Sequence, residues 1–214
     1  MKLYYYDHCP FSGRVRMALA LKQLEAEQQV LLADDEQTTT RLIGEHQIPV
    51  LVRQDDTPMA DSLGIVKYLD YLDGHPSIAA PHSPQLDEWL EPFVPDLQYL
   101  GYPRWTQIGL AEFATPSALE HFCEKKRHTI GDFQQAMENT PEKAREMEER
   151  LARLPQLVDL RPDREQVAWD DVVLFPMLRS LSVVKAIEWP DAVRQYTESM
   201  AERSDLDLFF DRAL

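Results

Sequence analysis

The chain has 214 residues, of which 37 are acidic and 22 basic, so its formal net charge is −15. Such a charge repels phosphate backbones and anionic membranes, so we expect neither nucleic acid nor a membrane as a partner. With 44% hydrophobic residues and two cysteines, the composition indicates a globular protein without a disulfide framework. No apolar run could span a membrane, and the N-terminus lacks the apolar core of a signal peptide. These features favour a cytoplasmic protein.

Strand and helix patterns alternate through residues 1–72, and this order predicts an α/β domain with a mixed sheet. Tyr4 and Tyr6 alternate along the first strand, so we expect both in the core. The predicted elements are a strand at 2–6, a helix at 10–24, a buried strand at 28–32, a short helix at 38–44, a hairpin of 49–52 with 57–60, and a helix at 61–72.

The composition changes at residue 73. Residues 73–84 contain three prolines and a glycine, which is typical of a linker. Residues 85–214 show only helical patterns, and this predicts an all-helical second domain. Its helices are expected near 85–100, 117–137, 141–157, 170–187 and 190–203.

The most informative position is Cys9, which lies where the first strand meets a helix that begins with Pro10. A thiol at a helix N-terminus faces unpaired N–H groups, which can lower its pKa from about 8.5 to as low as about 3.5–7.5. Arg14 and Arg16 follow in the first turns, although the sequence does not tell which way they point. The alternative is a small buried hydrophobic residue, the usual role of a free cysteine. The placement of Cys9 favours a nucleophile.

Two further sequence elements are informative when they are considered together with Cys9. The Ile48-Pro49 bond is either cis, which would leave the backbone of Ile48 free to pair with an extended peptide, or trans at the start of a strand. Asp61 and Ser62 begin a helix, where they either bind a carboxylate or serve as an ordinary cap. Only the three elements together are specific.

Together these motifs resemble the glutathione-transferase fold, which has a thioredoxin-like N-terminal domain followed by a helical C-terminal domain. Within that fold, the chain is similar to the glutaredoxin 2 family over essentially its whole length. The matching stretches include residues 1–4, 7–10, 30–32, 34–35, 47–49, 88–90, 174–176 and 189–190.

The resemblance implies a glutathione-dependent thiol–disulfide oxidoreductase that acts on glutathionylated or small disulfide substrates. Cys9 would form a mixed disulfide with glutathione, Ile48 would pair with its cysteinyl part, and Asp61 and Ser62 would hold its γ-glutamyl end. Pro10, Phe11 and Pro49 would complete the glutathione site. The glycyl carboxylate has only weak candidates, which are Lys22, Arg41 and His46. The resemblance also implies a monomer, with glutathione as co-substrate and no metal.

Two residues depart from the family. Ser12 stands where a second cysteine is usual, so exchange would proceed by a monothiol mechanism at Cys9, with a second glutathione resolving the mixed disulfide. Ser12 could alternatively donate a hydrogen bond to a thiolate. Ala168 replaces a capping serine or threonine ahead of Asp171, and we expect Asp170 to compensate.

Two other functions remain open. One is an omega-like glutathione transferase with thioltransferase, dehydroascorbate reductase or conjugation activity. The other is a non-catalytic or iron–sulfur-carrying glutathione-binding protein, which Pro10 disfavours because cluster-binding relatives tend to have glycine there. Cys123 is expected to be half-buried and inert. It does not share a helical face with His121 and His128, so we expect no metal site.

Overall fold

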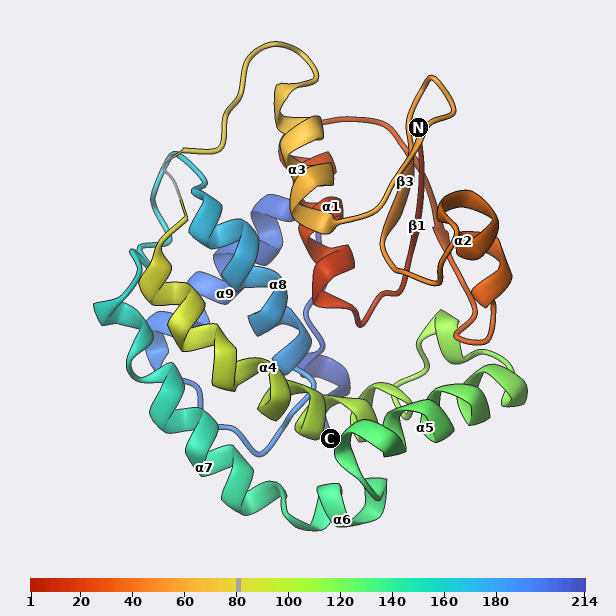
Figure 1. Cartoon of the computed structure of the whole chain (residues 1–214). Coiled ribbons are helices and arrows are strands. Elements are labelled where there is room, and N and C mark those ends of the chain that lie inside the picture. Colours follow the sequence, from red (N-terminus) through yellow and green to blue (C-terminus); the bar gives the residue numbers. More distant parts are fainter. Residues whose placement is uncertain (80–81) are drawn as a thin grey trace.

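The computed structural model describes residues 1–79 and 82–214. A four-stranded sheet lies at one side of the molecule, and helices make up the rest (Figure 1). The strand order is β2-β1-β3-β4, with β1 parallel to β2 and antiparallel to β3. This is the α/β arrangement that the sequence predicts. The strands are β1 (Lys2–Tyr5), β2 (Glu27–Val30), β3 (Val50–Val52) and β4 (Pro58–Met59).

Three helices accompany the sheet. In Figure 1, α1 and α3 lie together on one side of the strands, while α2 lies at the opposite side. Pro10 is the first residue of α1, where its missing N–H is no loss, and Gly44 ends α2 with a φ of 83°. The helices are α1 (Pro10–Leu21), α2 (Glu36–Ile43) and α3 (Ser62–Tyr71).

The second strand differs from the prediction of a buried element. β2 occupies an edge of the sheet, and its residues Glu27, Gln28 and Gln29 are exposed. The apolar residue that is buried, Leu31, follows the strand rather than lying in it. An edge strand has a neighbour on one side only, and polar side chains there discourage pairing with another chain.

The second half of the described chain is helical, as predicted. The helix expected at 117–137 is divided at Gly131, whose φ is 78°, and Asp132 then caps the next helix by accepting from the N–H of Gln135. The elements are α4 (Pro84–Trp105), η1 (Ala111–Phe113), α5 (Pro116–Ile130), α6 (Phe133–Glu138), α7 (Thr140–Leu151), η2 (Leu154–Gln156), α8 (Trp169–Leu181), α9 (Asp191–Ser204) and η3 (Phe210–Arg212).

The start of α8 retains half of a capping box. Asp171 accepts from the N–H of Ala168 at 2.7 Å, but the methyl group of Ala168 cannot accept in return. Asp170 does not compensate as expected. It accepts instead from the N–H of Ser83 and contacts the ring of His82, so it stabilises the beginning of α4.

The predicted linker, 73–84, includes residues 80 and 81, which lie outside the described residues. The part before them is fastened to the rest of the molecule. The buried carboxylate of Asp70 accepts from the N–H groups of Ser77 and Ile78, and the N–H of Ala79 donates to the carbonyl of Val167. In residues 1–79 and 82–214, no helix combines the length and apolar character that a membrane crossing requires.

Candidate active site

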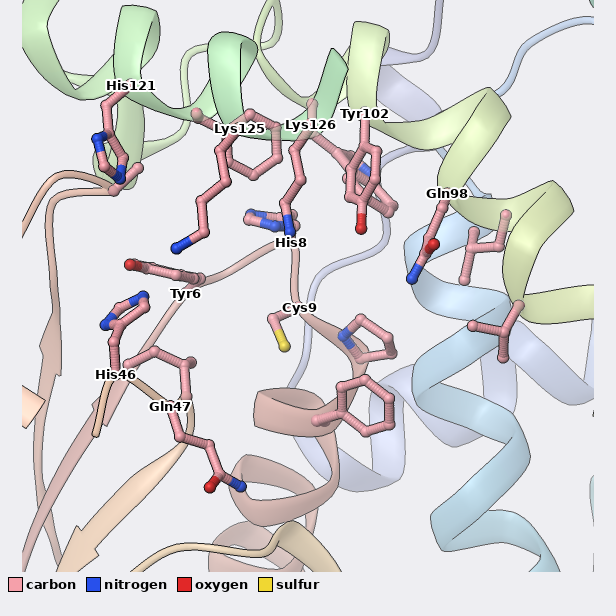
Figure 2. A pocket seen from close by; sticks show the side chains of 18 of the residues that line it. Tyr6, His8, Cys9, His46, Gln47, Gln98, Tyr102, His121, Lys125 and Lys126 are labelled. Carbon is pink, nitrogen blue, oxygen red and sulfur yellow. The ribbon is translucent and has the colours of Figure 1, made fainter. Parts of the chain in front are cut away.

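Cys9 is the N-cap residue of α1, at the end of the loop that leaves β1. Its carbonyl accepts from the N–H of Gly13 at 3.0 Å, which is the first bond of the helix. Its side chain faces a cavity of about 350 Å³ between the sheet-containing part and α4 and α5 (Figure 2). The thiol therefore lies at the helix terminus that the sequence predicts.

The electrostatic environment of Cys9 contains two opposing influences. Burial raises the pKa of the thiol, while hydrogen bonds from Ser12 and the N–H of Phe11 and the charge of Arg14 lower it. Burial outweighs the others, so the predicted lowering of this pKa is wrong. The helix terminus supplies the expected donors, but the sequence does not reveal how far the thiol is withdrawn from water.

Ser12 lies at the first turn of α1 and is fully buried. Its hydroxyl oxygen accepts from the N–H of Tyr6 at 3.4 Å, so its proton is left to point elsewhere. The hydroxyl lies within hydrogen-bonding reach of the Cys9 sulfur, where it favours the thiolate. Ser12 thus provides a donor, and it has no sulfur with which to form a disulfide.

A second cavity, of about 360 Å³, continues from the first along the sheet-containing part. The Ile48–Pro49 peptide bond at its edge is cis, which resolves the alternatives that the sequence left open. Pro10 lines the cavity of Cys9, and Phe11 and Ile48 line both. We call the residues that line the second cavity the thioredoxin-like wall: Phe11, Arg14, Gln47, Ile48, Pro49, Asp61 and Ser62.

Asp61 and Ser62 lie where α3 begins, as predicted. Asp61 accepts from the N–H of Gly64 at 3.0 Å and has a φ of 68°, a left-handed conformation that is uncommon for an aspartate outside special sites. The hydroxyl of buried Ser62 accepts from the guanidinium of Arg14 at 3.3 Å. Both side chains are therefore held in place, Asp61 by the next turn of α3 and Ser62 by Arg14 of the same wall.

Arg14 is the arginine, of the two that follow Cys9 in the sequence, that the structure places in this wall. Its guanidinium is buried, lies 4.8 Å from the centre of the Phe11 ring, and faces the cavity. Burial lowers the pKa of Arg14 to about 10, so the group remains cationic at neutral pH. Arg16, two residues on, contacts Asp7 at 2.5 Å instead. Helical periodicity separates the two arginines, but their directions depend on the packing of α1.

Of the three candidates for the glycyl carboxylate, only His46 lines the cavity of Cys9. Its Nδ1 lies 3.1 Å from the hydroxyl of Thr39. Lys22 contacts Asp73 and the carbonyl of His75, away from the cavity, and Arg41 lines neither of these two cavities. His46 is the candidate that the structure places near the thiol.

The opposite side of the cavity consists of residues that the sequence motifs do not include. Tyr6, which follows β1, also lines the cavity, contrary to the expectation that it packs in the core. The alternate residues Leu3 and Tyr5 face the core instead. The hydroxyl of Tyr6 is buried and has no hydrogen-bond partner in the described structure. We call the polar residues on α4 and α5 that line the cavity the helical wall: Gln98, Tyr102, His121, Lys125 and Lys126 (Figure 2).

The loop before Cys9 is held by the helical part. The guanidinium of Arg179, on α8, donates to the carbonyl of Asp7 at 2.6 Å and to its carboxylate at 2.8 Å. The carboxylate of Glu112, in η1, lies 2.7 Å from Nδ1 of His8 and accepts from its N–H, and Ser180 donates to the carbonyl of His8. We call these contacts the Asp7–His8 latch. They fix the backbone that carries the thiol.

The electrostatics of the latch favour a charged carboxylate at Asp7. Burial raises the pKa of Asp7, but the guanidinium groups of Arg179 and Arg16 outweigh it and hold this pKa below its ordinary value. The pKa of Arg179 is itself lowered by burial. In the ranges 1–79 and 82–214, no group of three or more histidine, cysteine or carboxylate side chains is arranged to hold a metal ion.

A four-stranded thioredoxin-like sheet with Cys9 at a helix terminus, followed by a helical domain, is the arrangement of the glutathione-transferase fold. Residues 3–77 match the glutathione S-transferase N-terminal domain family. Solved structures share this fold, among them Gtt2 from Saccharomyces cerevisiae, with a TM-score of 0.56 and 17% identity over 94% of this chain and 96% of that one.

Within this class the match is specific. Residues 85–213 match the family described as glutaredoxin 2, C-terminal domain. Glutaredoxin 2 of Escherichia coli K12 is 36% identical over 216 aligned residues, covering the whole of both proteins. The structure of glutaredoxin 2 from Salmonella typhimurium in complex with glutathione has a TM-score of 0.94 and 35% identity, over 100% of this chain and 98% of that one. The chain belongs to the glutaredoxin 2 family.

This membership makes the chain a glutathione-dependent oxidoreductase, as the sequence resemblance implies. The two rival functions, an omega-like transferase and a non-catalytic or iron–sulfur-carrying protein, gain no support from the comparisons. The more distant transferases share only the fold with this chain.

Proposed function

We propose that the chain reduces glutathione mixed disulfides by a monothiol mechanism in which Cys9 is the nucleophile. The observation that carries this proposal is Ser12, a buried hydroxyl in the first turn of α1, within reach of the Cys9 sulfur. The only other cysteine, Cys123, is half-buried on α5 and does not line the cavity.

Glutathione binding to the thioredoxin-like wall is the first part of the proposal. The Salmonella typhimurium relative was solved in complex with glutathione, and this chain matches it over its full length. Asp61 and Ser62 would hold the γ-glutamyl end, with Arg14 supplying the positive charge that its carboxylate requires. Ile48, which lines both cavities, would pair its backbone with the cysteinyl part.

The chemical steps follow from this placement. The Cys9 thiolate attacks the glutathionyl sulfur of a mixed disulfide RS–SG, so the Cys9–glutathione bond forms and RS⁻ leaves with the bonding electrons. A second glutathione thiolate then attacks the bound glutathionyl sulfur and releases oxidised glutathione and the Cys9 thiolate. The proton lost by the second glutathione ends on RS⁻. Ser12 favours the thiolate at the beginning and end of each cycle.

The proposal also covers the substrates, oligomeric state, location and domains of the enzyme. Its substrates are glutathionylated proteins and small disulfides, and the chain acts as a monomer in the cytoplasm. Its two domains are residues 1–72 and 85–214, joined by the linker 73–84. Metal ions have no role in this chemistry.

The test combines variants of both cysteines and of Ser12. Cys9→Ser should abolish reduction of a glutathione mixed disulfide, and mass spectrometry should no longer find a glutathione adduct. Cys123→Ser should retain both the activity and the adduct. Ser12→Cys should create a dithiol pair and raise the reduction of protein disulfides several-fold, while Ser12→Ala should not. Activity that survives Cys9→Ser, or a Ser12→Cys variant without gain, would refute the monothiol mechanism.

A further inference from the structure

The proposed cycle leaves one binding event without a site. The thioredoxin-like wall accounts for the glutathionyl group, but each step also involves a second thiol on the far side of the glutathionyl sulfur. This thiol leaves in the first step and attacks in the second. Because disulfide exchange places the three sulfur atoms roughly in line, the departing and the attacking thiol occupy the same region of the cavity. That region is bounded by the helical wall.

Lys126 is the cation of this wall that the protein does not neutralise. Its ammonium group lies 5.0 Å from the centre of the Tyr102 ring and 5.6 Å from that of Phe122, so two aromatic faces position it. No carboxylate of the described residues lies within 4.0 Å of it. In Figure 2 the side chain extends from α5 toward Cys9.

The neighbouring lysine has a different arrangement. Lys125 contacts the carboxylate of Glu36 on α2 at 2.6 Å, and His121 lies 3.2 Å from the same oxygen. These contacts join α5 to the sheet-containing part across one end of the cavity. Lys125 is therefore already paired, and Lys126 remains available.

The electrostatic coupling between Lys126 and the thiol agrees with this geometry. Burial and the charge of Lys125 lower the pKa of Lys126, whereas the negative charge of Cys9 raises it. The pKa of Tyr102 is raised to about 12 by burial, and the Cys9 charge adds to this effect, so its hydroxyl stays protonated and can donate. An anion near Cys9 would thus meet an ammonium group and a hydroxyl donor.

We propose that the helical wall is the binding site of the second thiol and that it selects thiols that carry a carboxylate, with Lys126 as the recognising cation. The inference rests on the monothiol function proposed above. Glutathione, which is anionic, is one such thiol, and acidic leaving thiols of mixed disulfides are others. In a chain with a net charge of −15, an anionic thiol is repelled by the surface as a whole, so a local cation is needed to hold it.

The experiment isolates the second step. The Cys123→Ser protein is loaded with one glutathione at Cys9, and the release of that glutathione is followed by stopped flow with three small thiols. These are 3-mercaptopropionate, which is anionic, 2-mercaptoethanol, which is neutral, and cysteamine, which is cationic. Rates are compared per thiolate, so that differences in thiol pKa do not enter. We expect the anionic thiol to react fastest, and its advantage to shrink as the salt concentration rises.

Lys126→Gln should reduce the anionic-to-neutral rate ratio about tenfold, the effect of roughly 1.4 kcal/mol of lost interaction. The matched control is Lys67→Gln, which removes the same charge from an exposed position on α3 that lines none of the described cavities. This control should leave the ratio unchanged, apart from the small effect of net charge.

Three outcomes overturn the inference. An equal rate for the three thiols would show that the wall does not select. A uniform fall in all rates with Lys126→Gln would show that Lys126 acts on Cys9 rather than on the incoming thiol. In both cases the monothiol function would stand, because loading and release still occur. Failure of Cys9 to take up glutathione would refute that function and the inference together.

Discussion

The thioredoxin-like wall and the helical wall of the active-site cavity differ in how their polar groups are satisfied. On the first, Asp61 accepts from Gly64 and Ser62 accepts from Arg14, so the groups are oriented before any ligand arrives. On the second, the cationic Lys126 lies against aromatic rings without an acidic partner in the described structure. A wall whose polar groups have fixed partners suits one ligand of constant shape, and a wall with an unpaired cation suits anionic thiols that vary.

The Asp7–His8 latch joins the loop before Cys9, which lies between the two walls, to α8 and η1, and breaking it should have the largest effect. Asp7→Asn leaves the guanidinium of Arg179, whose side chain is only 2% exposed, without its carboxylate. Because Asp7 is itself partly exposed, we expect a loss of about 2–3 kcal/mol in the free energy of unfolding, somewhat less than for a fully buried pair. Urea unfolding measures it. The control Asp73→Asn breaks a more exposed pair with Lys22 and should change stability by less than about 1 kcal/mol.

The same variant supplies a test of pH dependence. Since the pKa of Asp7 is lowered in the folded protein, the stabilisation is complete above the pKa of the unfolded residue, about 3.9. It is lost as the pH falls through the lower pKa of the folded state. The difference in unfolding free energy between the wild type and Asp7→Asn should thus be largest near neutral pH and should shrink below about pH 4. A difference that is constant with pH would contradict the ion pair.

Replacing Arg14 tests the thioredoxin-like wall and should have an effect of intermediate size. Arg14→Gln removes a charge-assisted hydrogen bond, so we expect the KM for glutathione to rise about tenfold to thirtyfold. The pKa of Cys9 should also rise, because the charge of Arg14 lowers it. Arg14→Lys keeps the charge but not the planar donors, so it should raise KM while leaving the thiol pKa nearly unchanged. Steady-state kinetics and the ultraviolet absorbance of the thiolate separate the two effects.

Replacing Asp61 should have the smallest effect. Two variants separate its role in glutathione binding from its role as the cap of α3. Asp61→Ala loses the bond to the N–H of Gly64 and places alanine at a φ of 68°, so it should lower stability by about 1–2 kcal/mol. Asp61→Asn keeps the cap and tolerates this conformation. Both variants should raise the KM for glutathione several-fold, but only the alanine variant should lower Tm. An asparagine variant with an unchanged KM would remove Asp61 from the binding site.

Sequence reasoning predicts most of the thioredoxin-like wall because its residues lie in short motifs at element boundaries. Cys9 before Pro10, Ile48 before Pro49, and Asp61 before a helix each indicate a local geometry that few residues change. The helical wall has no such signal. Lys126 and Tyr102 occupy ordinary helix positions, and which of them face the cavity depends on how α4 and α5 pack against the sheet-containing part.

The same dependence on contacts between distant segments explains the predictions that are wrong. Tyr6 was expected in the core because alternation along β1 shows two faces but not which face is covered, and the covered face belongs to Leu3 and Tyr5. Neither the extent to which Cys9 is withdrawn from water nor the edge position of β2 can be obtained from local sequence. Each depends on neighbours that are distant in the chain, as does the partner of Asp170.

The Asp7–His8 latch also predicts that catalytic activity is lost before the protein unfolds. Because the residues before Cys9 are held by Arg179, Glu112 and Ser180, any loosening between the helices and the sheet frees the thiol before either part melts. Heat, or a pH below about 4, would therefore inactivate the protein at a stage when its circular dichroism is still native. The alkylation rate of Cys9 is a direct reporter of that early opening. The latch thus couples catalytic competence to the contact between the loop before Cys9 and the helices.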